Sequence, residues 1–277
     1  MKPAAFDYVR PASLDEAIGV LASAGGEAMP LAGGQSLLPL LGLRMTTVGR
    51  LVDIGRLAAL RQVEETASHV VIGAALTHAE VEDGRVPDPG NGLMRRMAAR
   101  IAYRAVRNQG TIGGSIAMAD PAADWPVCLI ALDAKARIAG AKGQRTVPVA
   151  ELIEDIYTTS LARDEIIVAF EIPRLDAAAR TGVAKVARKT GAFAMSLAVA
   201  VVNDGARAAR VVLSGAANRA VRLPATSALL QSKDTSDATL SDAIGRDLSE
   251  TAGELDDYSV RLHRAVVLRA IAEARAS

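Results

Sequence analysis

Two glycine pairs in separate parts of this chain constrain its fold more than any other feature. Gly33-Gly34 follows the apolar segment 29–31, and Gly113-Gly114 lies between the hydroxyl residues Thr111 and Ser115. Glycines at a strand-to-helix turn let backbone N–H groups approach an anion, because no Cβ stands in the way. The pattern predicts a ligand held between two lobes, each of which contributes one glycine turn.

The first glycine pair does not identify the ligand on its own. It is not part of a G-x-G-x-x-G fingerprint and no G-K-[ST] follows it, so neither a Rossmann site nor a P-loop is predicted. An ordinary tight turn, with Ser36 capping the next helix, is the better explanation of this pair taken alone.

The second glycine pair shifts the balance towards a ligand site. Asn108 and Gln109 precede it, and amide and hydroxyl donors together suffice to grip a pyrophosphate without a lysine. Asp124, expected one turn into the following helix, could accept a hydrogen bond from a ribose hydroxyl or the adenine. A favourable interaction with the helix dipole explains Asp124 equally well.

Composition excludes several classes of function. The chain has 277 residues, enough for two or three domains, and a net charge of +1 with no basic stripe, so a nucleic-acid partner is not expected. No apolar run approaches the roughly 20 residues of a membrane span, and no signal segment is apparent, which predicts a cytoplasmic protein. The single cysteine, Cys128, cannot form an internal disulfide or ligate an iron–sulfur cluster, and the three histidines show no metal-ligand spacing.

Hydrophobic patterning predicts an α+β fold in two parts. Residues 1–56 are expected to form a small α/β lobe and residues 57–175 a second lobe, with a boundary in the polar connection 174–180. Within the second lobe a helix is expected over 93–103, and Asp120-Pro121 is expected to cap and open another helix that ends near 132. The remainder, 176–277, is predicted to be a three-stranded meander with a turn at 203–205, followed by three helices.

The segments LAGGQSLLPLL and RNQGTIGGSIAMADPAAD, in this order and at this separation, resemble the flavoprotein (medium) subunit of the molybdenum hydroxylases. That family includes carbon monoxide, xanthine and aldehyde dehydrogenases. The resemblance covers essentially the whole chain. It implies a two-lobed FAD-binding domain of the PCMH type, followed by a C-terminal domain of antiparallel sheet and helices like that of the carbon monoxide dehydrogenase flavoproteins.

The resemblance also implies which residues bind FAD. The first loop would wrap the pyrophosphate, the second would hold it from the other lobe, and Lys185 would place a positive charge beside the isoalloxazine, where it stabilises the reduced flavin. Phe193 would lie beside the ring, although a core phenylalanine and a solvated lysine are equally good explanations. The implied contacts are Leu31, Ala32, Gly33, Gly34, Gln35, Ser36, Leu37, Gly110, Thr111, Ile112, Gly113, Gly114, Ser115, Asp124, Ile167, Lys185 and Phe193.

Two departures from the family pattern concern details near the flavin. Ala192 stands where many relatives have an acid, and Met118 stands where many have a histidine. No nucleophile–base pair is apparent, so no catalytic residue is expected in this chain.

The resemblance further implies a molybdenum-cofactor large subunit and a small subunit with two [2Fe–2S] clusters as partners, in a dimer of heterotrimers. The chain would pass electrons from the clusters through FAD to an outside acceptor. Two alternatives remain open at this point: a free-standing FAD-dependent oxidoreductase of the same superfamily, and a scaffold that has lost FAD.

Overall fold

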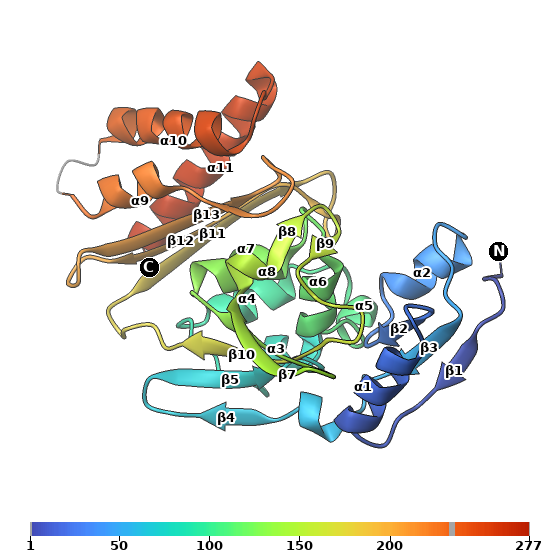
Figure 1. Cartoon of the computed structure of the whole chain (residues 1–277). Helices are drawn as coiled ribbons and strands as arrows, with labels where there is room; N and C mark the ends of the chain where they lie inside the picture. Colours follow the sequence, from blue (N-terminus) through green and yellow to red (C-terminus); the bar gives the residue numbers. More distant parts are fainter. Residues whose placement is uncertain (1, 233–235, 277) are drawn as a thin grey trace.

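The computed structural model describes residues 2–232 and 236–276, and its elements fall into three groups (Figure 1). The N-terminal group is a parallel sheet in the order β1-β3-β2 with two helices. The Ser13 hydroxyl accepts from the Glu16 N–H and caps the start of the first helix. Its elements are β1 (Asp7–Val9), α1 (Leu14–Ser23), β2 (Ala28–Leu31), α2 (Leu37–Gly42) and β3 (Arg50–Asp53).

The middle group is built on an antiparallel five-stranded sheet in the order β4-β5-β10-β6-β7, with helices packed against it. The strands are β4 (Val63–Glu65), β5 (His69–Gly73), β6 (Lys135–Gly140), β7 (Gly143–Pro148) and β10 (Ile166–Pro173). The helical segments are η1 (Ala58–Leu60), α3 (His78–Glu82), α4 (Leu93–Ala99), α5 (Arg104–Arg107), α6 (Ile112–Met118), α7 (Asp124–Ala131) and α8 (Val149–Leu152), and a small hairpin joins β8 (Ile153–Asp155) to β9 (Thr158–Thr159).

The C-terminal group is the predicted meander with one added short strand, in the order β11-β12-β13-β14, and three helices. Its strands are β11 (Arg180–Ala187), β12 (Ala194–Asn203), β13 (Ala208–Ser214) and β14 (Val221–Arg222), and its helices are α9 (Pro224–Leu230), α10 (Asp237–Thr251) and α11 (Asp257–Ala276). Helix α11 lies so close to β11 that a Cβ on Gly182 would overlap the Ala270 carbonyl.

Strand β12 joins the middle and C-terminal groups because both of its faces are buried. Leu197, Val199 and Val201 belong to the main core with the helices and sheet of the middle group. The alternate residues Ala198, Ala200 and Val202 belong to a second core under α10 and α11. The N-terminal group has a smaller core of its own, which reaches the middle group through Leu60, Ala75, Ala139, Ile166 and partly buried Val168.

Three local predictions were wrong. The helix expected over 93–103 ends at Ala99, and a separate short helix, α5, follows. Asp120 does not cap a helix; its Oδ1 accepts from the Ala122 N–H in a turn, and α7 begins only at Asp124. Asp124 is therefore the first residue of its helix and does not lie one turn into it. A short acidic side chain can bond to a backbone N–H two residues on, and here that turn replaces the helix start.

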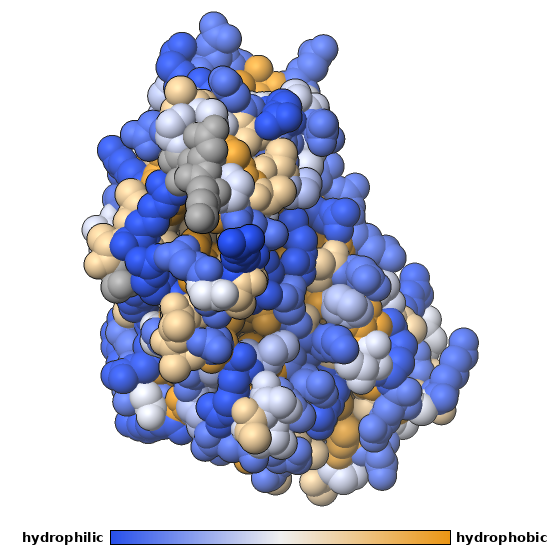
Figure 2. Space-filling model, turned by 90° about the vertical axis from the view of Figure 1, so that its left-hand side faces the viewer, coloured by the Kyte–Doolittle hydropathy of each residue, from blue (hydrophilic) through white to orange (hydrophobic). Residues whose placement is uncertain are grey.

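No helix in the part of the chain that the structure describes has the length and hydrophobicity to cross a membrane. The face shown in Figure 2 is mainly hydrophilic, and its apolar areas are small and separated.

Candidate functional site

The two glycine motifs meet at the junction between the N-terminal and middle groups. A Cβ on Gly33 would overlap the Gln109 carbonyl and would lie 2.8 Å from the Gly110 Cα, so the two backbones are in direct contact there. The Cβ position of Gly114 is 3.9 Å from the Ala32 Cβ. The predicted arrangement of two lobes, each contributing one motif to a shared junction, is therefore present.

The first loop presents consecutive backbone donors without acceptors. Within the described residues, none of the N–H groups from Gly33 to Ser36 makes a hydrogen bond, and the Ser36 hydroxyl makes none either. Gly34 has a φ of +70°, a conformation that glycine adopts at no steric cost. A run of unpaired N–H groups around such a turn is the backbone geometry of an anion site.

The second motif differs from the expected turn, because Gly113 and Gly114 lie in the first turn of α6. The Thr111 hydroxyl caps this helix by accepting from the Gly114 N–H at 3.0 Å. The N–H groups from Ile112 to Ser115 all bond within the chain, so they are not available to a ligand. What this motif offers is the Ser115 hydroxyl, which makes no hydrogen bond to a described residue, and the donor proton of Thr111.

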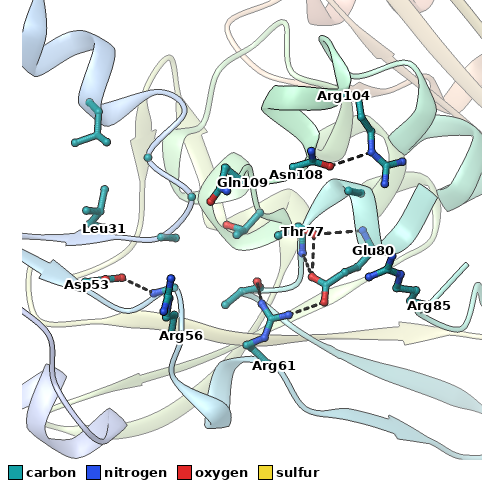
Figure 3. Close-up of a pocket in the computed structure, with 18 of the residues that line it drawn as sticks. Leu31, Asp53, Arg56, Arg61, Thr77, Glu80, Arg85, Arg104, Asn108 and Gln109 are labelled. Atoms are coloured by element: carbon teal, nitrogen blue, oxygen red, sulfur yellow. Dashed lines mark hydrogen bonds and ion pairs between the residues drawn. The ribbon is translucent and has the colours of Figure 1, made fainter. Parts of the chain in front are cut away.

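A cavity of about 660 Å³ opens beside this junction, between the two groups (Figure 3). One wall belongs to the N-terminal group and is formed at the ends of its three parallel strands. The residues there are Arg10, the segment 31–34 and Asp53 to Arg56. The carboxyl edge of a parallel sheet is where ligands bind in such folds, because all the strand-end loops converge there. The opposite wall comes from α3, α5 and the loop that leads to Thr111.

The cavity is lined by more positive than negative side chains. Five arginines and three carboxylates face it, and most are paired: Arg61 bonds to Glu80 at 2.5 Å, and Arg104 bonds to Asp83 at 2.7 Å. Arg56 is exposed and makes no ion pair with a described residue. The excess of positive charge suits a phosphate-bearing ligand.

Asp124 and Lys185 form a buried ion pair, with the Lys185 Nζ at 2.8 and 3.0 Å from the two carboxylate oxygens. Burial raises the pKa of the Asp124 carboxyl, and the charge and hydrogen bond of Lys185 oppose that rise. The pair joins α7 of the middle group to β11 of the C-terminal sheet.

The family is decided by comparison with known proteins. Residues 4–175 match the model of the FAD binding domain in molybdopterin dehydrogenase. The chain is 33% identical to the 6-hydroxypseudooxynicotine dehydrogenase complex subunit alpha of Paenarthrobacter nicotinovorans, over 99% of this chain and 96% of that protein. It belongs to the FAD-binding subunits of the molybdenum hydroxylases.

Other relatives agree with this assignment. The chain is 32% identical to the nicotine 6-hydroxylase medium subunit of the same organism, over 85% of this chain and 83% of that protein. The fold matches a solved structure of carbon monoxide dehydrogenase from Hydrogenophaga pseudoflava with a TM-score of 0.94 and 33% identity, covering 100% of this chain and 99% of the other. The chain is thus a medium subunit of an oxidoreductase complex, and its cofactor is FAD.

The residues implied by the resemblance do not all surround one cavity. Leu31, Ala32, Gly33, Gly34 and Thr111 line the cavity at the junction, while Lys185 borders a second cavity described below. Ile112 and Ile167 are core residues, and Gly110 and Gly113 pack on His78 and Ala74. The remaining residues implied by the resemblance line neither cavity: Gln35, Ser36, Leu37, Gly114, Ser115, Asp124 and Phe193.

The structure decides against two alternative explanations. Phe193 is 63% exposed, so it is not a core residue, and its ring is free to contact a cofactor or a partner. The Lys185 side chain is 10% exposed and paired, so it is not a solvated strand residue. Their roles beside FAD remain predictions.

A buried histidine supports the second motif. The Trp125 Nε1–H donates to His78 Nδ1 at 2.9 Å, and the backbone N–H of His78 donates to the Gly110 carbonyl. Burial, with a smaller contribution from the charge of Arg107, lowers the pKa of His78 to about 4, so the ring is neutral at pH 7.

Sequence reasoning missed the arginines of the cavity and the role of His78. Arg10 and Arg56 could have been found, because each closely follows a predicted strand of the N-terminal lobe and parallel strands bring such positions together. No local sequence pattern indicated the role of His78, because its partner Trp125 is distant in sequence.

Proposed function

We propose that this chain transfers electrons from the [2Fe–2S] clusters of a partner subunit, through FAD, to an external acceptor. The partners are a molybdenum-cofactor large subunit and an iron–sulfur small subunit, in a dimer of heterotrimers. The observation that carries the proposal is the run of unpaired N–H groups from Gly33 to Ser36, in a loop that contacts the second motif at the lobe junction. The cytoplasmic location stays a prediction.

The binding residues divide the work between the two lobes. The first loop would supply backbone donors to the pyrophosphate, and the Thr111 and Ser115 hydroxyls would add donors from the other side. Arg56 would supply counter-charge across the cavity. Bound FAD provides the redox chemistry, and the chain holds and tunes it. Lys185, held by Asp124, would set the charge near the flavin ring.

The free-standing alternative is disfavoured because two histidines and the cysteine, which are residue types used in substrate chemistry, are occupied or buried. His78 accepts from Trp125, and the buried His263 bonds to the Ser196 hydroxyl at 2.9 Å. Cys128 is fully buried, and burial raises the pKa of its thiol. The named relatives act in complexes on chemically unrelated molecules, a nicotine derivative and carbon monoxide. Substrate choice in another subunit explains that diversity.

A double variant, Ser36→Ala with Ser115→Ala, tests the FAD site. Each hydroxyl bonded to a charged group contributes about 1.5 kcal/mol, so loss of both should raise the FAD dissociation constant about 100-fold, measured by quenching of flavin fluorescence. Thr111→Val is a poor test, because it also removes a helix cap. Thr111→Ser keeps that cap and should bind FAD normally. Unchanged affinity in the double variant would contradict the assignment.

The electron route is tested on the complex purified from its native host. After removal of FAD, substrate should still reduce the iron–sulfur clusters, while reduction of the acceptor should stop and return when FAD is added. Acceptor reduction that continues without FAD would refute the route. Substrate oxidation by this chain alone would support the free-standing alternative.

A further inference from the structure

A second cavity, of about 630 Å³, lies along the outer edge of β11, away from the lobe junction. Its walls are the end of α4, residues 183–187 of β11, the loop 189–192 and the exposed side of α11 at Arg269 and Glu273. Strand β11 is the edge strand of the C-terminal sheet, since its one neighbour there is β12. The cavity is therefore a groove with a sheet edge as its floor.

One end of this edge is already satisfied by the chain itself. Arg96 Nη2 donates to the Thr181 carbonyl at 2.9 Å, and Arg100 Nη1 donates to the Val183 carbonyl at 3.0 Å. In an antiparallel pair, alternate residues turn both N–H and C=O away from the neighbouring strand. The next outward-facing residues are Lys185 and Ala187, and no described side chain donates to their carbonyls.

The groove also carries positive charge without matching carboxylates. Arg100, Lys189 and Arg269 line it, and none forms an ion pair with a described residue. The one acid of the lining, Glu273, pairs with Arg96. An open edge, together with Lys189 and Arg269, which form no ion pair with a described residue, favours a ligand that combines a backbone with negative side chains.

We propose that this groove binds an extended acidic segment of a partner subunit, which adds as a strand to the edge of β11 at Lys185 and Ala187. Its carboxylates would meet Lys189 and Arg269 on the two walls. The inference rests on the proposed membership of a complex, and it identifies where on this chain a partner docks. The groove ends at the loop that leads to Phe193, so docking would occur beside the expected flavin.

Hydrogen exchange tests the added strand. The FAD-saturated full chain and the complex purified from its host are compared, and the amides of Lys185 and Ala187 should exchange at least ~10-fold more slowly in the complex. Equal exchange overturns the proposal. A second comparison adds 10 mM inorganic phosphate to the isolated chain. If phosphate alone slows exchange of these two amides as much as the complex does, the groove is a small-anion site and the proposal is overturned.

Charge reversal tests the acidic character of the partner. Lys189→Glu with Arg269→Glu should lower the salt concentration at which native mass spectrometry shows half of the complex dissociated. The matched control is Arg207→Glu with Arg246→Glu, which reverses two exposed cations outside the groove. It should leave the salt concentration at half dissociation unchanged. Equal stability of the two double variants overturns the proposal. A chain that never co-purifies with other subunits refutes the proposed function as well, whereas a complex with an unprotected edge refutes this inference alone.

Discussion

Acid should weaken the middle lobe through one residue, His78. Its ring is 6% exposed and accepts a hydrogen bond from Trp125, so protonation would both bury a charge and remove that acceptor. The folded-state pKa of about 4 lies below the ordinary histidine pKa of 6.5, which means that the unfolded chain binds more protons between these values. Stability is complete above pH 6.5 and is lost as the pH falls towards 4. The linkage relation gives a loss of about 2 kcal/mol between pH 7.5 and pH 5.

The assay uses the one tryptophan of the chain, Trp125, which contacts His78 directly. Urea unfolding followed by its fluorescence, with FAD in fixed excess, gives the free energy of unfolding of this region at each pH. His78→Gln keeps an acceptor for the indole N–H but does not titrate in this range. The variant should therefore lose about 2 kcal/mol less than the natural chain between pH 7.5 and pH 5. Equal losses in the two proteins would refute the argument, because all other titrating groups are shared.

Two further perturbations test the junction. Gly33→Ala places a methyl group against the Gln109 carbonyl, so the two lobes must move apart. We expect the free energy of unfolding to fall by about 2 kcal/mol or more and FAD binding to weaken. Gly42→Ala is the control, because its methyl group meets no atom within 4 Å and should not change the stability. A fully stable Gly33→Ala protein would show that the backbones are not in contact. Arg56→Gln should raise the FAD dissociation constant by roughly 3- to 10-fold and flatten its dependence on salt. Arg207→Gln, at a residue that does not line the cavity, should do neither.

Much of the fold could be predicted because local patterns agreed with the tertiary structure. The strand at Arg50–Asp53 and the helix capped by Thr77 have clear hydrophobic and capping signals. The meander follows from apolar strand segments and the turn at 203–205. The short elements β4, β8, β9 and β14 carry too few residues for such a pattern. The turn at Asp120 depends on the choice between two backbone bonds of similar strength, which sequence does not settle.

The site was predicted less completely, because glycine has more than one use. The sequence pattern assigns Gly33, Gly110 and Gly113 to ligand approach, yet each of them permits close contact between two parts of the protein. Of the two motifs, the first loop has the unpaired backbone N–H groups, because α6 begins at Ile112 and its first N–H groups bond within the chain. A glycine pair does not indicate that difference. The pairing of Asp124 with Lys185 joins residues that are distant in sequence and left no local signal.

The double-sided burial of β12 has a consequence for dissecting the molecule. A protease cut in the connection near 175 would not release a stable flavin domain, because removal of β12 would uncover the main core beside Leu197 and Val199. The C-terminal fragment would expose the same face of its sheet. Each separated piece would then aggregate through its newly exposed apolar surface. A chain cut at this point should therefore stay together as long as both halves remain folded.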